Sequence, residues 1–259
     1  MSLKGKGLGA ARRGIMSGNI RTRGGSLVAL SGLRAALLVL AKAPVPGKVK
    51  TRLCPPATPE QAARIAAAAF LDSLDAVLAV PGVAPVVALT GDLTDAVDGA
   101  TLTARLRATT VLPQRGTTLG QRIAAAYADT GAALGIRPVL QIGMDTPQID
   151  AALLGHCLDV LDGDGVDAAL GMAADGGWWV LGVRRPELAE LIAGVPTSRP
   201  DTGAQTLAAL HAAGCRVVEL PELSDVDTWP DAVAVAAQVP GSRFAATVAA
   251  ASVALDLRR

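Results

Sequence analysis

The chain has 259 residues and a mass of 26.1 kDa; 51% of its residues are hydrophobic and 2% are aromatic. This length suits one large α/β domain or two small ones, and so few aromatic rings argue against a single-stranded nucleic-acid binder, which needs stacking platforms. The net charge of +1 conceals an asymmetry, because residues 1–59 hold eleven of the 24 Lys and Arg residues and none of the 23 Asp and Glu residues.

Cysteine usage and the N-terminal region bear on localisation. Cys54, Cys157 and Cys215 form neither a zinc-binding spacing nor a disulfide framework, which favours the cytoplasm. No run of 18 or more apolar residues is present, so no membrane span is expected. Residues 1–34, rich in Gly, Ser and Arg, are predicted to be a disordered basic extension. An export signal is the alternative, although Arg34 interrupts its apolar stretch.

The first predicted strand is followed by a strongly basic loop. Leu37–Leu40 is a continuous apolar run, typical of a strand buried on both faces of a parallel sheet. The prolines and the glycine that follow force the backbone to turn. The loop carries four cations and no acidic residue: Lys42, Lys48, Lys50 and Arg52. Lysine suits phosphate oxygens as a point charge, so the loop is predicted to bind phosphate; a solvated basic loop is the alternative.

Helix and strand patterns alternate along the rest of the chain. Helices are predicted to begin at Thr58 and Thr118, each with a capping box, and at Thr146–Pro147. Further helices are predicted over 186–193, 201–212 and from Trp229 to about Val239. The further strands are predicted at Pro85–Leu89, Thr110–Leu112, Pro138–Ile142, Val166–Met172, Trp178–Val183 and Arg216–Leu220. This order predicts an α/β fold with a mostly parallel, doubly wound sheet of about seven strands flanked by helices.

The pattern also predicts how the chain divides. Residues 35–240 are expected to form one domain, and 241–259 an Ala-rich helical tail that packs either on this domain or on a partner. The sequence therefore leaves open whether two copies of the chain form a homodimer.

Isolated carboxylates follow several of the predicted strands. In open sheets of this class ligands bind beyond the carboxyl ends of the strands, so the basic loop, Asp145 and the pair Asp225 and Asp227 are expected on one rim. Asp145 is the preferred metal ligand, and capping of the following helix is its alternative role. Asp227 is expected either to be a second metal ligand or to cap the final helix. A turn and the strand after it are predicted to contact substrate through Asp175, Gly176, Gly177 and Trp178.

Several motifs carry a resemblance to a known family. They are LAKAPVPGKVKTRL from Leu40 to Leu53, Gly143-x-Asp145-x-Pro147, Asp175-Gly176-Gly177 and Asp225-x-Asp227-Thr228. Together they resemble the DUF2064 family, described as glycosyltransferase-like with the GT-A nucleotide-diphospho-sugar transferase fold. The resemblance implies that a nucleotide phosphate site is formed by Lys42, Pro46, Gly47, Lys48, Lys50 and Arg52. It also implies Mg²⁺ or Mn²⁺ on Asp145. Asp145 and Lys50 are the residues expected to be catalytic.

Three functions remain open at this stage. The leading hypothesis is a metal-dependent transferase that takes a sugar from a nucleotide-sugar donor to an acceptor that the sequence does not identify. The second is a nucleotidyltransferase that releases pyrophosphate from an NTP. The third is a non-catalytic nucleotide-binding protein.

Overall fold

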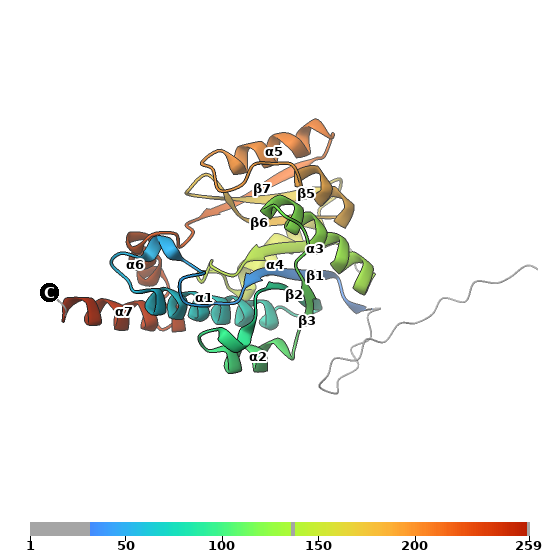
Figure 1. Cartoon of the computed structure of the whole chain (residues 1–259). Coiled ribbons are helices and arrows are strands. Elements are labelled where there is room, and N and C mark those ends of the chain that lie inside the picture. Colours follow the sequence, from blue (N-terminus) through green and yellow to red (C-terminus); the bar gives the residue numbers. More distant parts are fainter. Residues whose placement is uncertain (1–31, 136–137, 258–259) are drawn as a thin grey trace, which may run out of the picture.

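The computed structural model of the chain describes residues 32–135 and 138–257. Its centre is one seven-stranded sheet with strand order β3-β2-β1-β4-β6-β5-β7 (Figure 1). The strands are β1 (Ala35–Lys42), β2 (Val83–Thr90), β3 (Thr110–Pro113), β4 (Val139–Gly143), β5 (Ala168–Ala173), β6 (Trp178–Val183) and β7 (Val217–Leu223). Among these described strands, β6 runs antiparallel to its neighbours β4 and β5, and the remaining strand pairs are parallel. The predicted mostly parallel, doubly wound α/β fold is confirmed.

Helices cover both faces of the sheet. One face packs against α1 (Pro59–Ala79), α2 (Gly99–Leu106) and α4 (Ala151–Leu161). The other face packs against α3 (Leu119–Leu134), α5 (Thr202–Ala212) and the 3-10 helix η4 (Pro186–Ile192). Two further short 3-10 helices are η2 (Thr51–Leu53) and η3 (Leu93–Asp95). Leu, Val and Ala side chains fill both layers of the core, as the scarcity of aromatic residues requires.

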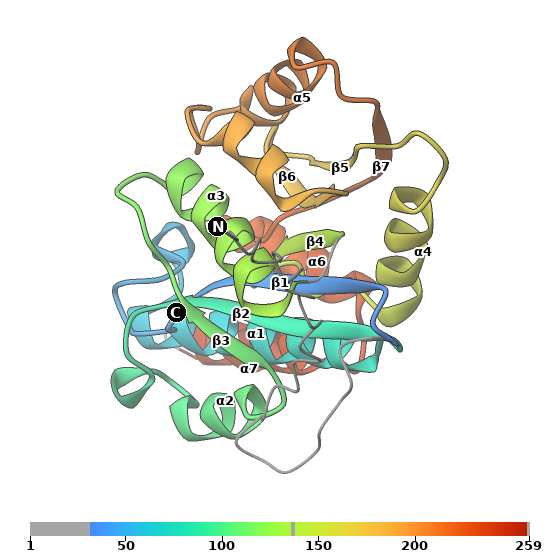
Figure 2. The same ribbon diagram turned by 90° about the vertical axis from the view of Figure 1, so that its right-hand side faces the viewer.

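The C-terminal helices form a third layer outside α1. These are α6 (Trp229–Gln238) and α7 (Arg243–Asp256), and α7 lies beside α1 in both views of the chain (Figures 1 and 2). Phe244 and Val248 of α7 are buried against the apolar outer side of α1. The backbone N–H of Phe244 and Arg243 Nη1 each donate to the Asp72 carboxylate of α1, both at 2.9 Å. The tail therefore packs on the body of its own chain.

The observed N-caps of the helices agree with two of the three predicted helix starts. Thr58 and Thr118 both form the predicted capping boxes. The prediction that Thr146 and Pro147 open a helix is wrong, because α4 begins at Ala151 and the Asp150 side chain accepts from the N–H of Leu153. Asp145 is thus five residues before the cap and does not cap this helix.

The N-terminal prediction falls mostly outside the described residues, since residues 1–31 are not described. At its end, Arg34 is anchored to the body: its N–H donates to Gly82 O at 2.8 Å and its guanidinium pairs with Asp159 at 2.6 Å. Within 32–135 and 138–257, no helix is both long enough and apolar enough to cross a bilayer.

Candidate active site

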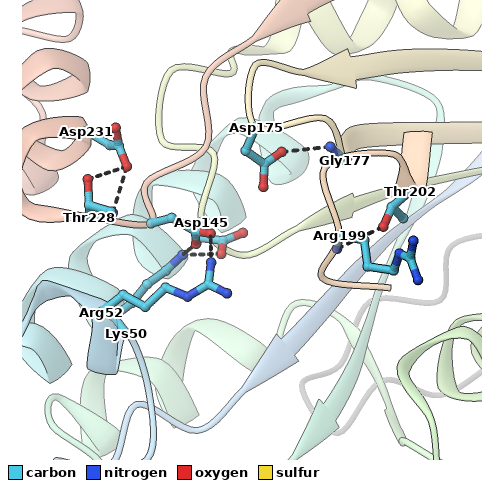
Figure 3. Close-up of polar contacts among 10 residues, drawn as sticks. Lys50, Arg52, Asp145, Asp175, Gly177, Arg199, Thr202, Thr228 and Asp231 are labelled. Atoms are coloured by element: carbon cyan, nitrogen blue, oxygen red, sulfur yellow. Dashed lines mark hydrogen bonds and ion pairs between the residues drawn. The ribbon is translucent and has the colours of Figure 1, made fainter. Parts of the chain in front are cut away.

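The basic loop and the acidic segments meet at the carboxyl edge of the sheet. The loop follows β1, Asp145 follows β4, and Asp227 follows β7, so three strands distant in sequence supply one cluster. Figure 3 shows Lys50 and Arg52 of the loop beside Asp145. Lys50 Nζ lies 2.5 Å from Asp145 Oδ2 and 3.4 Å from Asp227 Oδ1. Arg52 Nη1 lies 2.8 Å from Asp227 Oδ2. Two of the four cations predicted to meet phosphate, Lys50 and Arg52, are therefore paired with the carboxylates predicted to hold the metal.

Lys50 has an unusual backbone and an unusual environment. Its φ and ψ of 45° and 40° are left-handed, which is costly for a residue with a Cβ. Its side chain is 12% exposed. Burial by itself lowers the pKa of Lys50, but the charge of Asp145 and its hydrogen bond, with Asp227 and Asp225, outweigh burial and raise the pKa. Lys50 is a charged ammonium held inside an acidic cluster.

The loop that presents Lys50 is held by backbone hydrogen bonds, one to β2 and one within the loop. The N–H of Ala43 donates to Thr90 O at 2.8 Å, and the N–H of Lys48 donates to Val45 O at 3.0 Å. Gly47 has a φ of +72°, which a glycine adopts without strain in this Pro46-Gly47 turn. Lys42 and Lys48 both have exposed side chains on the same segment.

Asp145 is positioned by the residues before it. A Cβ on Gly143 would lie 2.6 Å from Asp145 Oδ1, so the absence of a side chain at Gly143 gives the carboxylate its space. Met144 is buried, and its sulfur accepts from the N–H of Lys42 at 3.1 Å. This contact joins the end of β1 to the Asp145 segment.

Asp225 is a site residue to which the sequence assigns no role. Burial, and then the charge of Asp145, raise the pKa of Asp225 to about 8, while Lys50 opposes the rise. Its Oδ1 is buried and has no hydrogen-bond partner among the described residues. The Gln148 amide donates to Ser224 O at 2.5 Å and so joins the Asp145 segment to the Asp225 segment. The sequence signal was its position in Asp225-Val-Asp227, two residues from a predicted ligand.

The Asp175 turn lies on the same edge, between β5 and β6. Asp175 Oδ1 accepts from the N–H of Gly177 at 2.8 Å, which fixes the carboxylate (Figure 3). Gly176 has a φ of +87°, and a Cβ there would overlap Pro200 O, so the turn is in close contact with the segment before α5. The charge of Asp175 also contributes to the raised pKa of Asp225.

The two tryptophans of β6 point to opposite faces of the sheet, as predicted. Trp179 is 1% exposed in one core layer, and Trp178 is half-buried at the other. Trp179 Nε1 donates to Pro221 O at 2.9 Å, so the indole N–H of this buried ring has a hydrogen-bond partner.

The acidic cluster fits a divalent ion that keeps part of its own ligand shell. Carboxylate oxygens are the ligands that Mg²⁺ and Mn²⁺ prefer, and the unpartnered Oδ1 of Asp225 is a further donor. In the part of the chain that the structure describes, no three His, Cys, Asp or Glu side chains are grouped closely enough to hold a metal by themselves. The fit is therefore to an ion bound by one or two carboxylates and completed by phosphate oxygens and water.

This chain is similar to known proteins both in sequence and in structure. The profile of a family described as uncharacterized proteins conserved in bacteria (DUF2064) matches residues 73–199, which include Asp145 and Asp175. A crystal structure of a candidate nucleotide-diphospho-sugar transferase from Desulfovibrio desulfuricans G20 has a TM-score of 0.74 and 26% identity, covering 87% of this chain and 98% of that one. A cytidylyltransferase from Leptospira borgpetersenii shares the fold at a TM-score of 0.51 and 15% identity, covering 84% and 93%. No curated protein matches. The resemblance to the DUF2064 family that the sequence motifs indicate is confirmed.

Proposed function

We propose that this protein is a metal-dependent transferase that moves a sugar from a nucleotide-diphosphate donor to a hydroxyl acceptor. The observation that carries the proposal is the cluster of Lys50 and Arg52 with Asp145 and Asp227 at the carboxyl edge of the sheet. It combines the cations that a diphosphate needs with the oxygen donors that its metal needs. The D. desulfuricans neighbour, named as a candidate nucleotide-diphospho-sugar transferase, supports the choice of donor.

Each part of the cluster has a task in such a transfer. The acceptor oxygen forms a bond to the anomeric carbon, and the bond from that carbon to the diphosphate breaks, so negative charge grows on the leaving diphosphate. Lys50 and Arg52, with Lys42 and Lys48 on the same loop, would stabilise that charge. Asp145 and Asp227 would hold Mg²⁺ or Mn²⁺, which when bound neutralises phosphate charge. The Asp175 carboxylate would accept a hydrogen bond from the acceptor hydroxyl and take its proton as the new bond to the anomeric carbon forms.

The test is to identify the product released from a set of activated donors. The protein is incubated with NDP-sugars, or with NTPs, in Mn²⁺ or in EDTA, and free NDP and pyrophosphate are quantified. We expect NDP from an NDP-sugar only with Mn²⁺, and a rate at least ~100-fold lower for Asp145→Asn. The matched control is Asp162→Asn, an exposed aspartate at the end of α4, which should retain the full rate.

The same assay separates the alternatives. Pyrophosphate released from an NTP would replace glycosyl transfer with nucleotidyl transfer at this site. Release of neither product, together with nucleotide binding that is indifferent to Mn²⁺ and to Asp145→Asn, would leave a non-catalytic nucleotide-binding protein.

A further inference from the structure

The carboxylates that would hold the metal are already engaged by the protein's own cations. Lys50 Nζ contacts Asp145 Oδ2 at 2.5 Å and Asp227 Oδ1 at 3.4 Å, so the ammonium lies between the two side chains. Arg52 contacts the other oxygen of Asp227 at 2.8 Å. A free divalent ion that approached Asp145 and Asp227 would have to displace Lys50 first.

We propose that Lys50 is a resident cation that keeps free divalent ions off this site, so that the site takes its metal as a metal–polyphosphate complex. This inference rests on the proposed function and specifies the form in which donor and metal bind together. A polyphosphate offers Lys50 and Arg52 new anionic partners at the moment when the metal needs their carboxylates. The exchange keeps every charge paired before and after binding, which neither ligand achieves alone.

The geometry of Lys50 suits such an exchange. Its carbonyl accepts from the N–H of Leu53 at 3.0 Å, and it caps η2 in a left-handed conformation, so its backbone is held in place. The ammonium is joined to that fixed backbone by a flexible four-carbon stem and can change partners without a backbone movement. A cation outside the cluster does not have this role: Arg107, which directly follows α2, is exposed and provides a matched control.

The ion pair also explains why the metal alone should bind weakly. Displacing the ammonium without a phosphate partner would leave a charge that is 12% exposed without its counter-ions. An uncompensated buried charge is strongly unfavourable, so this cost opposes the binding of free metal. Polyphosphate removes the cost because it supplies the missing anion.

The experiment measures Mn²⁺ binding by isothermal titration calorimetry in wild type, Lys50→Met, Lys50→Gly and Arg107→Met. Glycine is the second variant because it accepts the φ of 45° at this position, and thermal unfolding verifies that each variant is folded. We expect both Lys50 variants to bind free Mn²⁺ at least ~10-fold more tightly than wild type, because the carboxylates lose their competitor, and Arg107→Met to stay within about twofold. In parallel, equilibrium dialysis measures retention of inorganic pyrophosphate with and without Mn²⁺.

Wild type should retain pyrophosphate with Mn²⁺ present, and the Lys50 variants should retain less. Equal Mn²⁺ affinity in wild type and both Lys50 variants, with Mn²⁺-dependent pyrophosphate retention intact, would overturn the role of Lys50 and leave the proposed function standing. If no variant bound Mn²⁺, and none retained pyrophosphate in a Mn²⁺-dependent way, the metal-dependent function itself would be overturned.

Discussion

Replacing Asp225 with asparagine should stabilise the metal-free protein at neutral and alkaline pH. Burial and the neighbouring carboxylates raise the pKa of Asp225 from 3.8 to about 8. A raised carboxyl pKa means that the folded state disfavours the charged form. The wild-type free energy of unfolding therefore falls as the pH rises from about 3.8 to about 8, and the loss is complete above the folded-state pKa. The asparagine side chain carries no charge at any pH in this window, so the variant avoids the loss.

The size of the effect follows from the shift and from the exposure of the side chain. At about 1.4 kcal/mol per pH unit, the full shift would amount to about 5–6 kcal/mol. Asp225 is half-buried, and Lys50 offsets part of the repulsion, so we expect about 1–2 kcal/mol after screening. For a chain of this length that corresponds to a rise in Tm of about 2–6 °C.

The assay is thermal unfolding in EDTA between pH 4.5 and 8.5 for wild type, Asp225→Asn and the exposed control Asp162→Asn. The gain in Tm of Asp225→Asn should be small at pH 4.5 and grow towards pH 8.5, while the control should follow wild type. A gain that is the same at every pH, or a variant less stable than wild type at pH 8, would refute the electrostatic argument.

Three further substitutions test the geometry. Gly143→Ala brings a Cβ to within 2.6 Å of Asp145 Oδ1, so Mn²⁺-dependent binding of pyrophosphate in equilibrium dialysis should fall at least ~10-fold, with a loss of stability below about 2 kcal/mol. Asp72→Ala removes the acceptor for the backbone N–H of Phe244 and for the Arg243 guanidinium, and should cost about 1–2 kcal/mol in urea unfolding. Gly176→Ala combines a φ of +87° with an overlap on Pro200 O, and should cost more than about 2 kcal/mol.

Matched variants separate the causes of these effects. Gly155→Ala in α4 meets nothing within 4 Å, so unchanged ligand binding there isolates the contact made at Gly143. Gly82 has a φ of +68°, and a Cβ added there would have no atom within 4 Å, so Gly82→Ala measures backbone strain without steric overlap. If Gly82→Ala cost as much as Gly176→Ala, the contact with Pro200 would contribute nothing. If Asp72→Ala left the urea midpoint unchanged, α7 would be held by its apolar face alone.

The sequence predicts the topology of the site well because a simple rule governs it. Parallel strands of an open sheet end at one edge, so strand patterns alone indicate that the loop with Lys50, Asp145 and Asp227 meet. The structure bears this out through the two contacts that Lys50 makes. The roles of these side chains in binding and catalysis stay predictions.

Other features depend on tertiary contacts that no local pattern contains. Thr146-Pro147 and Asp150 carry equally good capping chemistry, but α4 is capped by Asp150, which accepts from the N–H of Leu153. Thr146 Oγ1 is buried and has no hydrogen-bond partner among the described residues. The raised pKa of Asp225 arises first from burial and then from carboxylates that include Asp145 and Asp175 on two other segments of the sheet edge. The left-handed Lys50 could not be expected, because only its surroundings make that backbone conformation favourable.

The most direct test of the account is the melting temperature of wild type and Asp145→Asn with a panel of NDPs and NDP-sugars, in Mn²⁺ or in EDTA. A ligand at about 100 times its Kd adds about 2.7 kcal/mol, a rise of roughly 5–8 °C for this chain. We predict that rise for at least one nucleotide on wild type with Mn²⁺, and a rise several degrees smaller in EDTA or on Asp145→Asn. A rise of equal size in all these conditions, or no rise with any nucleotide, would contradict the account.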